Sequence, residues 1–357
     1  MGPRWYPLYP CLDGMMTMDR DADQHYRAGD TILRGALTSG GVVPKHLVTV
    51  AIPVYERLEY LPQAIESVRR QDYPHVELIV SSNGRNPEVP DLVERYYGKA
   101  FRFRQNLVAV PMAAHFNQLV DAASGEYFLL LSDDDEISSN CLSTLVGLLD
   151  RDPGATLALC RVEAMDKSGD TTASSDEMPL APPVMTGPGF VRAWCLYTHK
   201  FICLGTNLSR TTDVRALGGY PAFASGHGID NALVVKLCLT GRVLFTAACT
   251  FRFRIHDASY SQSASCATWA RGSREFLSFL DTDPHLLRFA NAHPETWAET
   301  KALLIRMTYR NYLARWMRVY RRSMSPWAWV KAAFALPGIP RSYARALMPR
   351  AKSVRPT

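Results

Sequence analysis

The sequence predicts an α/β fold in which helices flank a mostly parallel sheet, with a helical appendage at the C-terminal end. Apolar runs rich in β-branched residues alternate with segments of helical period over residues 46–135, a pattern typical of βαβ units. A cluster of acidic residues directly follows one of these apolar runs. Beyond residue 266, apolar and aromatic residues recur at helical spacing.

Composition and charge narrow the class of protein. The 357 residues are 47% hydrophobic and 21% charged, which excludes collagen-like and wholly disordered chains. The length predicts two units, or one large α/β unit with an appendage. The net charge of +6 is unevenly divided, because residues 301–357 contain 13 Lys and Arg but no Asp or Glu. Nucleic-acid binding is not expected from so small a total charge.

Cysteine usage and hydropathy predict the compartment. The eight cysteines stand singly and form no C-x-x-C pair, which argues against a zinc finger, a redox motif and a disulfide framework. The N-terminal segment lacks the uninterrupted apolar core of a secretory signal. No uncharged apolar run approaches the roughly 20 residues that span a bilayer. We therefore expect a protein of the reducing, cytoplasmic compartment.

The elements follow in order along the chain. Residues 1–45 show neither helical nor strand period, so we expect a loosely ordered extension. LVTVAIPVY, from Leu47, is the apolar run of a buried parallel strand. A helix is predicted over 59–71, where apolar residues recur on one face, and a second strand over 76–84.

A third strand and its helix lead to the acidic cluster. AFRFRQN predicts the strand, VPMAAHFNQLVDAASG predicts a helix ended by Gly125, and EYFLLLSDDD predicts a strand that ends in acid. Ligands of open parallel sheets bind beyond the carboxyl ends of the strands. The segments after the predicted strands are therefore the candidate site.

The acidic cluster is SDDDE, from Ser132 to Glu136. Three adjacent carboxylates repel one another, and a cation or a solvated loop relieves that repulsion. An isolated DDD is more typical of a solvated loop that caps the next helix. Its position at the end of a predicted central strand favours a site in which Mg²⁺ or Mn²⁺ is held together with a diphosphate.

These motifs together resemble a known family. VTVAIPVYERLEYLPQAIESVRRQDYPHVELIVSSNG, followed further along by GEYFLLLSDDDEI, resembles the nucleotide-binding half of the family 2 glycosyltransferases. The resemblance covers roughly residues 47–260. It implies a GT-A fold, meaning a Rossmann-like, mostly parallel sheet flanked by helices. It also implies a nucleoside-diphosphate sugar as donor and Mn²⁺ or Mg²⁺ as cofactor.

The resemblance assigns donor-binding residues to three strand ends. In order along the chain they are Pro53, Tyr55, Glu56, Ser82, Asn83, Asp133, Asp134 and Asp135. The register of the metal-binding motif falls either on Asp133 and Asp135 or on Ser132 and Asp134. We favour Asp133 towards the ribose, with Asp134 or Asp135 on the metal.

One position departs from the family pattern. Ser82 stands where the family commonly has an aspartate beside the base. A carboxylate accepts a hydrogen bond from uracil strongly, whereas a hydroxyl both accepts and donates. UDP is the favoured nucleotide, and dTDP and GDP stay open.

A second constellation lies in GHGIDNALVVKLCLTGRV. Asp230 falls in the N-terminal turn of the predicted helix, where the helix dipole favours its ionised form. It is either a residue that stabilises the helix or, as the resemblance implies, the general base that deprotonates the acceptor hydroxyl. His227, three residues earlier, is an alternative base or a structural histidine.

The third element is FRFRIHDASYSQS, from Phe251 to Ser263, which predicts a strand with one charged face. It is either an exposed basic edge or, by resemblance, the Arg-x-His element that closes over the diphosphate. In the second case Arg254 and His256 stabilise the departing nucleoside diphosphate, and His256 also binds the metal.

The C-terminal segment mixes Arg with Trp, Tyr, Leu and Met at helical spacing. Such a helix binds an anionic membrane surface, or it packs on the domain as an appendage with a solvated basic face. We favour membrane binding through 301–357, which places the protein at the inner face of the cell membrane, near a glycan or lipid-linked acceptor.

The sequence therefore predicts four segments. They are an extension (1–45), a nucleotide-sugar-binding half (46–150), an acceptor-binding and catalytic half (151–265) and a basic aromatic tail (266–357). The predicted activity is metal-dependent, inverting glycosyl transfer in surface glycan or glycoconjugate assembly. The alternatives are a binding-only relative, which Ser82 makes conceivable, and a sugar-phosphate nucleotidyltransferase, which lacks support because no Gly-rich loop follows the first strand.

Overall fold

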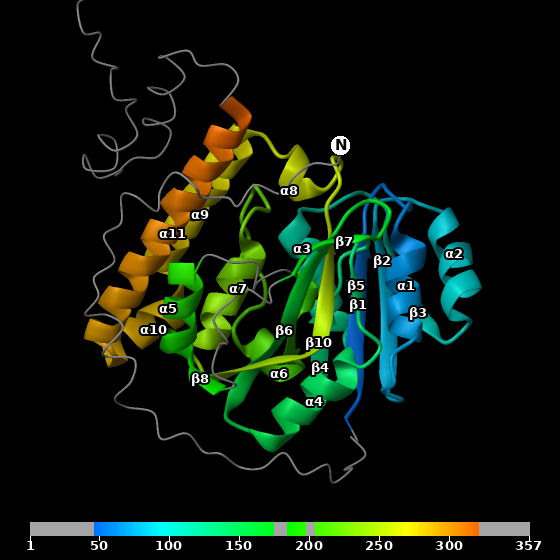
Figure 1. The fold of residues 1–357 in the computed structure, drawn as a ribbon, viewed down its shortest axis with the longest axis horizontal. Coiled ribbons are helices and arrows are strands. Elements are labelled where there is room, and N and C mark those ends of the chain that lie inside the picture. Colours follow the sequence, from blue (N-terminus) through cyan, green and yellow to red (C-terminus); the bar gives the residue numbers. More distant parts are fainter. Residues whose placement is uncertain (1–45, 175–183, 198–203, 321–357) are drawn as a thin grey trace, which may run out of the picture. The chain divides into compact units, whose positions relative to one another are not determined.

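A computed structural model describes residues 46–174, 184–197 and 204–320 (Figure 1). The predicted extension over 1–45 and the tail beyond residue 320 lie outside the described residues. The described chain forms a mixed α/β structure whose central sheet is mostly parallel and is flanked by helices, which confirms the predicted fold class.

The first part of the chain alternates strands and helices as the sequence predicts. Its elements are β1 (Val48–Val54), α1 (Leu61–Arg69), β2 (Val76–Asn83), α2 (Glu88–Tyr97), β3 (Phe101–Asn106), α3 (Met112–Ala122) and β4 (Tyr127–Leu130). Helix α2 had no counterpart in the sequence prediction. Its signal is the pair Val89 and Val93, four residues apart and both fully buried.

The second part adds strands of both directions. Its elements are β5 (Glu136–Ile137), α4 (Cys141–Arg151), β6 (Ala155–Met165), β7 (Thr171–Ser174), β8 (Val184–Thr186), α5 (Gly187–Tyr197), a 3₁₀ turn (Leu204–Thr206), β9 (Asn207–Arg210), α6 (Thr211–Ala216), α7 (Ile229–Cys238) and β10 (Arg242–Arg254). Four helices follow, namely α8 (Tyr260–Ser263), α9 (Cys266–Thr282), α10 (Pro284–Ala292) and α11 (Pro294–Tyr320).

The strand order places the candidate segments at one edge of the sheet. The order is β3-β2-β1-β4-β9-β6-β10-β5, with β7 beside β6 and β8 beside β10. Strands β1 to β4 run parallel, so their carboxyl ends meet at the upper edge in Figure 1. Strand β9 is antiparallel to both neighbours, and β10 runs parallel to β6. The predicted boundary at 150/151 falls in the last turn of α4, and the continuous sheet contains strands from both predicted halves.

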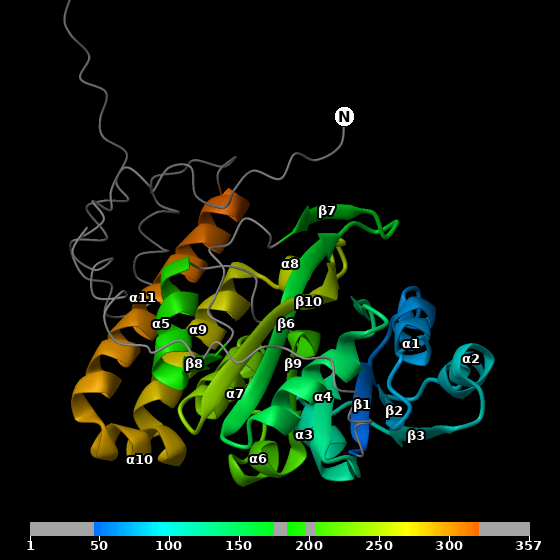
Figure 2. The same cartoon turned by 60° about the horizontal axis from the view of Figure 1, so that its bottom comes forward.

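The core lies on both faces of the sheet. Alternate residues of the strands point to opposite faces, so neighbours such as Leu129 and Leu130 enter different clusters. Helices α1, α2 and α4 cover one face, while α3, α7 and the C-terminal helices cover the other. Figure 2 shows α5, α9, α10 and α11 gathered on one side of the sheet.

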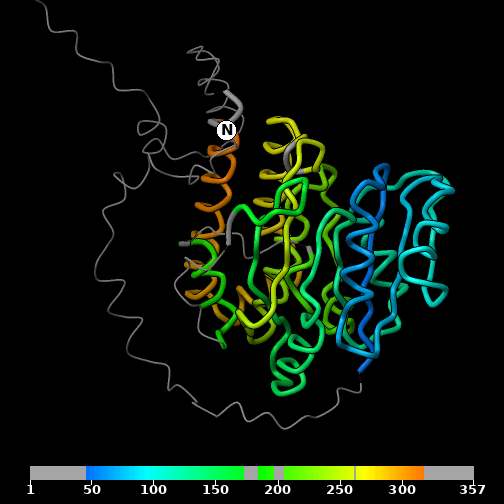
Figure 3. Tube along the Cα trace, turned by 45° about the vertical axis from the view of Figure 1, so that its right-hand side comes forward, coloured from blue at the N-terminus to red at the C-terminus, as the bar shows by residue number. Residues whose placement is uncertain are grey.

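Helix α11 packs its apolar face on the protein itself. Leu304, Met307, Tyr312 and Trp316 are all buried, against the core and against residues of α9. Figure 3 shows α11, in orange, on the side of the described chain away from β1 to β3. The predicted helix is present, and its described apolar face matches the packed-appendage alternative. Among the described helices, none is long and apolar enough to cross a membrane.

Gly125 has a different role from the predicted one. The helix before it ends earlier, at Ala122, and the glycine instead lies against the backbone of β1. A Cβ at this position would lie 2.5 Å from the backbone nitrogen of Thr49 and 2.7 Å from the carbonyl oxygen of Leu47. Glycine is therefore required for close approach rather than to end a helix.

We expect Gly125→Ala to lower the free energy of unfolding by about 3 kcal/mol, because backbone atoms cannot move aside as a flexible side chain would. Urea denaturation measures this change. The control is Gly147→Ala in the interior of α4, whose Cβ would meet only Arg151 at 4.0 Å. That variant should gain about 0.5–1 kcal/mol. Equal stability of the two variants would contradict the close-approach explanation.

Candidate functional site

The acidic turn is held between two strands. After β4, the Leu131 N–H donates to the Ala51 carbonyl at 2.9 Å, and the turn closes with Asp135 N–H donating to Ser132 O at 3.3 Å. The chain then enters β5, which pairs antiparallel with the end of β10. The acidic residues therefore lie where the end of β4 meets the end of β10.

Arg254 holds this turn in place through several hydrogen bonds. Its side chain is 2% exposed, and its guanidinium donates to Asp134 O at 2.9 Å and to Glu136 Oε1 at 2.6 Å. Its backbone N–H donates to Asp135 Oδ1 at 2.8 Å. The guanidinium also lies 4.6 Å from the centre of the Tyr60 ring. Arg254, at the end of β10, is therefore buried in an ionic contact. It does not belong to an exposed basic edge, which was one of the two alternatives for this strand.

His256 and Asp134 lie together although 122 residues separate them. His256 Nε2 is 3.0 Å from Asp134 Oδ2, and both side chains are mostly buried. The other ring nitrogen, Nδ1, lies 3.4 Å from Arg57 Nη1. The ring packs against Tyr60, with 4.9 Å between centroids. This pair combines a carboxylate with an imidazole.

The carboxylates of the turn are electrostatically strained. Burial, reinforced by the charge of Asp134, raises the pKa of Asp133 to about 7, although Arg57 opposes the rise. The same two causes raise the pKa of Asp135 well above its usual range. An added cation would relieve this repulsion. Carboxylate oxygens with one imidazole are suitable ligands for Mn²⁺ or Mg²⁺, so the donor set fits the predicted metal.

The residues predicted after β1 and β2 occupy two different environments. Tyr55 and Glu56 are exposed just beyond β1, and Pro53 pairs with Ser81 in the sheet. Ser82 is buried and donates its hydroxyl to Gly84 O at 2.8 Å. Both Ser82 and the loop after β1 lie at the carboxyl edge of the sheet.

Asn83 holds the loop that precedes α3. Its amide donates to Val110 O and accepts from Val110 N–H, each at 2.9 Å, and it also accepts from Asn106 at 3.0 Å. In the structure its side chain therefore binds the protein backbone and shapes the edge of the candidate site.

Asp230 lies in the first turn of α7, as predicted. The expectation that the helix dipole favours its ionised form is not met, because burial raises the pKa of its carboxyl although its Oδ1 accepts the Asn231 N–H at 2.8 Å. His227 packs its ring against Trp269 with 3.9 Å between centroids, and burial lowers its pKa to about 4. His227 is therefore a neutral, packed side chain, while Asp230 is a carboxylate of increased basicity.

Residues of the C-terminal helices support the loop before Asp230. Glu275 of α9 accepts the Ala224 N–H at 2.9 Å and the Ser225 N–H at 3.2 Å. The hydroxyl of Tyr260 donates to the Ser225 carbonyl. The sequence prediction missed these residues and also Arg57 and Tyr60. Arg57 and Tyr60 could have been found from their position shortly after the end of β1. Nothing in the sequence around Glu275 indicates its role.

Part of the chain matches a known family. Residues 49–214 match the sequence model of the family described as Glycosyl transferase family 2. A GalNAc(5)-diNAcBac-PP-undecaprenol beta-1,3-glucosyltransferase of Campylobacter jejuni is 34% identical over 103 residues, covering 28% of this chain and 33% of that protein. Abequosyltransferase RfbV of Salmonella typhimurium is 26% identical over 119 residues, covering 32% and 35%. The chain thus matches about a third of the length of these relatives.

The fold has a solved counterpart. The crystal structure of S. aureus TarS 1-349 superposes with a TM-score of 0.58 at 16% identity, covering 85% of this chain and 83% of that one. At this identity the similarity concerns the fold. It extends past the matched family segment into the C-terminal half of the chain.

The strain in the acidic turn predicts a pH dependence of stability. Because the pKa of Asp133 is raised, the folded state binds a proton more tightly than the unfolded state between about pH 4 and pH 7, and stability falls as pH rises through this window. Asp133→Asn removes the part of that fall that Asp133 contributes, while Asp135 keeps its own contribution. Without divalent cations, the variant should be more stable than the native chain by about 2 kcal/mol at pH 8 and equally stable below pH 4.

Denaturation in chelator at both pH values measures the difference. The control is Asp121→Asn, an exposed carboxylate on α3, which should change stability by less than about 0.5 kcal/mol at either pH. If the stability of Asp133→Asn depended on pH as that of the native chain does, the raised pKa of Asp133 would be refuted.

Proposed function

We propose that this chain, whose residues 49–214 belong to glycosyl transferase family 2, is a metal-dependent, inverting glycosyltransferase. It would move a sugar from a nucleoside-diphosphate sugar to an acceptor hydroxyl, in surface glycan or glycoconjugate biosynthesis. The observation that carries the proposal is the convergence of the strained acidic turn, His256 and Arg57 at the carboxyl edge of the sheet.

Asp134 and His256 are the proposed metal ligands. They are adjacent at 3.0 Å, whereas Asp135 is occupied by the backbone N–H of Arg254. This favours Asp134 over Asp135 as the carboxylate ligand, with Asp133 directed towards the ribose. When bound, Mn²⁺ or Mg²⁺ supplies positive charge to the departing diphosphate. Arg254 then acts by positioning the turn, because the acidic turn and its neighbours already accept its hydrogen bonds.

The donor lies across the ends of β1, β2 and β4 in this proposal. Tyr55 and Glu56 are exposed at this edge and available to a ligand, and Pro53 and Asn83 shape its floor. The family resemblance would place the base beside Ser82, which is buried at the end of β2. UDP is the favoured nucleotide, and TarS, which shares the fold, has been crystallised with UDP-GlcNAc. dTDP and GDP remain alternatives because Ser82 both donates and accepts.

Asp230 is the proposed general base. Inversion requires one displacement, in which the acceptor hydroxyl loses its proton as it attacks the anomeric carbon. A carboxylate whose pKa is raised by burial holds that proton better than an ordinary aspartate. Its place at the start of α7 is secured by the contacts of Glu275 and Tyr260 with the preceding loop.

The acceptor is proposed to be lipid-linked. The Campylobacter jejuni relative is named for an undecaprenol-diphosphate acceptor. Residues 321–357 contain eight Lys and Arg and no Asp or Glu, which suits an anionic membrane surface. We propose that this segment brings the enzyme to the inner face of the membrane, since the described apolar face of α11 is already buried.

We expect Asp230→Asn to lower the rate of sugar transfer by about 10²–10⁴-fold, because the amide cannot take the acceptor proton. Binding of the nucleotide should persist, as a thermal shift by UDP with Mn²⁺ would show. The matched control is Asp213→Asn, because Asp213 also lies in the first turn of a helix and burial also raises its pKa. Transfer by that variant should stay near the native rate.

Three results would count against this assignment. An unchanged rate of sugar transfer by Asp230→Asn would refute the assignment of Asp230 as general base. Nucleotide binding without transfer in the native chain, with suitable acceptors, would favour a binding-only protein. If no nucleoside diphosphate or nucleotide sugar shifts the melting temperature in the presence of Mn²⁺, the proposed donor site is refuted.

Deletion of residues 321–357 should abolish sedimentation with anionic liposomes. Each Lys or Arg near such a surface contributes about 1 kcal/mol, and the deletion removes eight. Helix α11 is retained because its buried residues belong to the core. The melting temperature and the hydrolysis of donor in solution should therefore be preserved. Sedimentation of the shortened chain with anionic liposomes would contradict a membrane role for this segment.

A further inference from the structure

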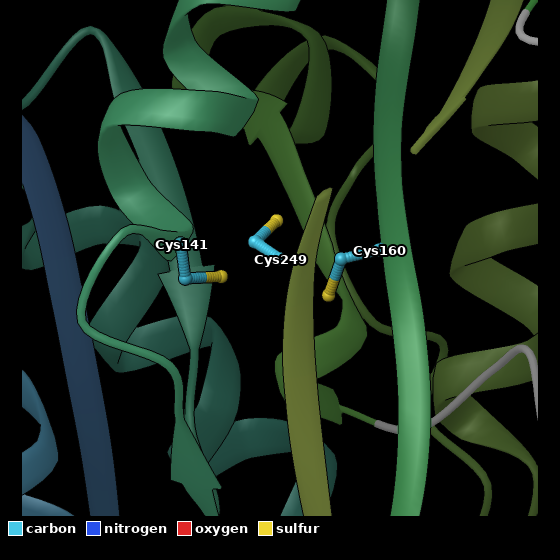
Figure 4. Close-up of side chains that lie close together, drawn as sticks. All are labelled: Cys141, Cys160 and Cys249. Carbon is cyan, nitrogen blue, oxygen red and sulfur yellow. The ribbon is translucent and has the colours of Figure 1, made fainter. Parts of the chain in front are cut away.

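Three cysteines from separate elements converge in the core. Cys141 begins α4, Cys160 lies on β6 and Cys249 lies on β10. Their sulfur atoms are all within 4.8 Å of one another, and the residues are 0%, 0% and 2% exposed. Figure 4 shows Cys141 and Cys160 on either side of Cys249. Across the described ranges, this is the one group of three or more Cys, His, Asp or Glu ligand atoms that lie so close.

A bulge in β10 brings the third thiol into the group. Thr246 pairs with Cys160, but Thr250 pairs with the very next residue of β6, so residues 247–249 are inserted on β10. Bulges of this kind redirect a side chain. The turn before α4 holds the bulge, because Asn140 Nδ2 donates to Ala248 O at 2.9 Å and Thr250 N–H donates to Ser138 Oγ at 3.0 Å.

The distances suit one ion bound by three sulfur atoms. Thiolates about 2.3 Å from a central Zn²⁺ lie roughly 4 Å apart in a trigonal plane, so small side-chain shifts suffice. Thiolate ligands select soft ions, whereas Mg²⁺ and Mn²⁺ prefer oxygen. The group therefore differs in its chemistry from the acidic turn.

The charge that binding creates has a partner. Three thiols and a divalent ion give a trithiolate complex of charge −1 and release three protons, with no change in oxidation state. A buried net charge is costly unless it is paired. Arg161 follows Cys160 in β6 and donates through Nε and Nη2 to Thr250 Oγ1, at 3.2 and 3.1 Å, which brings its positive charge beside Cys249. Its guanidinium also pairs with Glu163 at 3.1 Å, so Arg161 lies between that carboxylate and the thiols.

We propose that Cys141, Cys160 and Cys249 form a buried trithiolate site for one soft metal ion of the Zn²⁺ or Cd²⁺ class. The bound ion joins α4, which follows the acidic turn, to β6 and to β10, which leads into Arg254 and His256. The ion stabilises the packing of these three elements, which support the candidate active site, and it takes no part in sugar transfer.

The test uses Cd²⁺ and the reduced, full-length protein. Excess Mg²⁺ is present to occupy oxygen ligands. Because the thiols are buried, one equivalent of Cd²⁺ is added both to the folded protein, which must open locally, and during refolding. We expect an ultraviolet thiolate-to-Cd²⁺ charge-transfer band, three sulfur neighbours by X-ray absorption and a raised melting temperature. A first shell of oxygen and nitrogen alone would overturn the proposal.

Variants assign the sulfur ligands. Cys249→Ala should weaken Cd²⁺ binding at least about tenfold and abolish the three-sulfur shell, as should Cys141→Ala and Cys160→Ala. The matched control is Cys238→Ala, an equally buried cysteine of α7, which should keep the native band. A native band in all three cluster variants would refute the site. If a variant fails to fold, the number of sulfur neighbours in the native protein decides the question.

Discussion

The contact between Arg254 and the acidic turn is the constraint on which the candidate site depends. One buried guanidinium donates to the backbone of Asp134 and to the carboxylate of Glu136, while the Arg254 backbone N–H binds Asp135. Loss of one partner from a buried ion pair typically costs about 3–5 kcal/mol, so this arrangement resists opening. It fixes the end of β10 against the end of β4. His256, two residues further on, is thereby placed beside Asp134.

This rigidity maintains an electrostatic strain that the protein alone does not relieve. Fold and hydrogen bonds hold three consecutive aspartates at a partly buried edge, and the pKa values of Asp133 and Asp135 rise in response. Such preorganised negative charge favours a cation more than a flexible loop would, because the cost of bringing the carboxylates together is already met in folding. In the proposed function, a metal and a diphosphate would bind at this edge.

The C-terminal helices contribute to the same framework. Glu275 and Tyr260 hold the loop before Asp230, and α11 buries its aromatic residues against α9 and the core. The basic charge that first suggested a membrane helix therefore has two parts. The described part of α11 is structural, with Arg310 donating to Cys195 O and Arg315 to Ala264 O. The proposed membrane role therefore concerns only residues 321–357.

The sequence by itself determined the fold class, the strands and the helices other than α2 before the acidic turn, the turn itself and the place of Asp230 at a helix start. Periodicity and strand ends are local signals. It did not reveal that Arg254 is buried, that Asp134 lies beside His256, that Gly125 makes room for β1, or that three isolated cysteines meet. These relations join residues many positions apart. Only the strand order, the bulge in β10 and the packing of the helices decide them, because contacts between distant segments follow from the way the sheet is assembled.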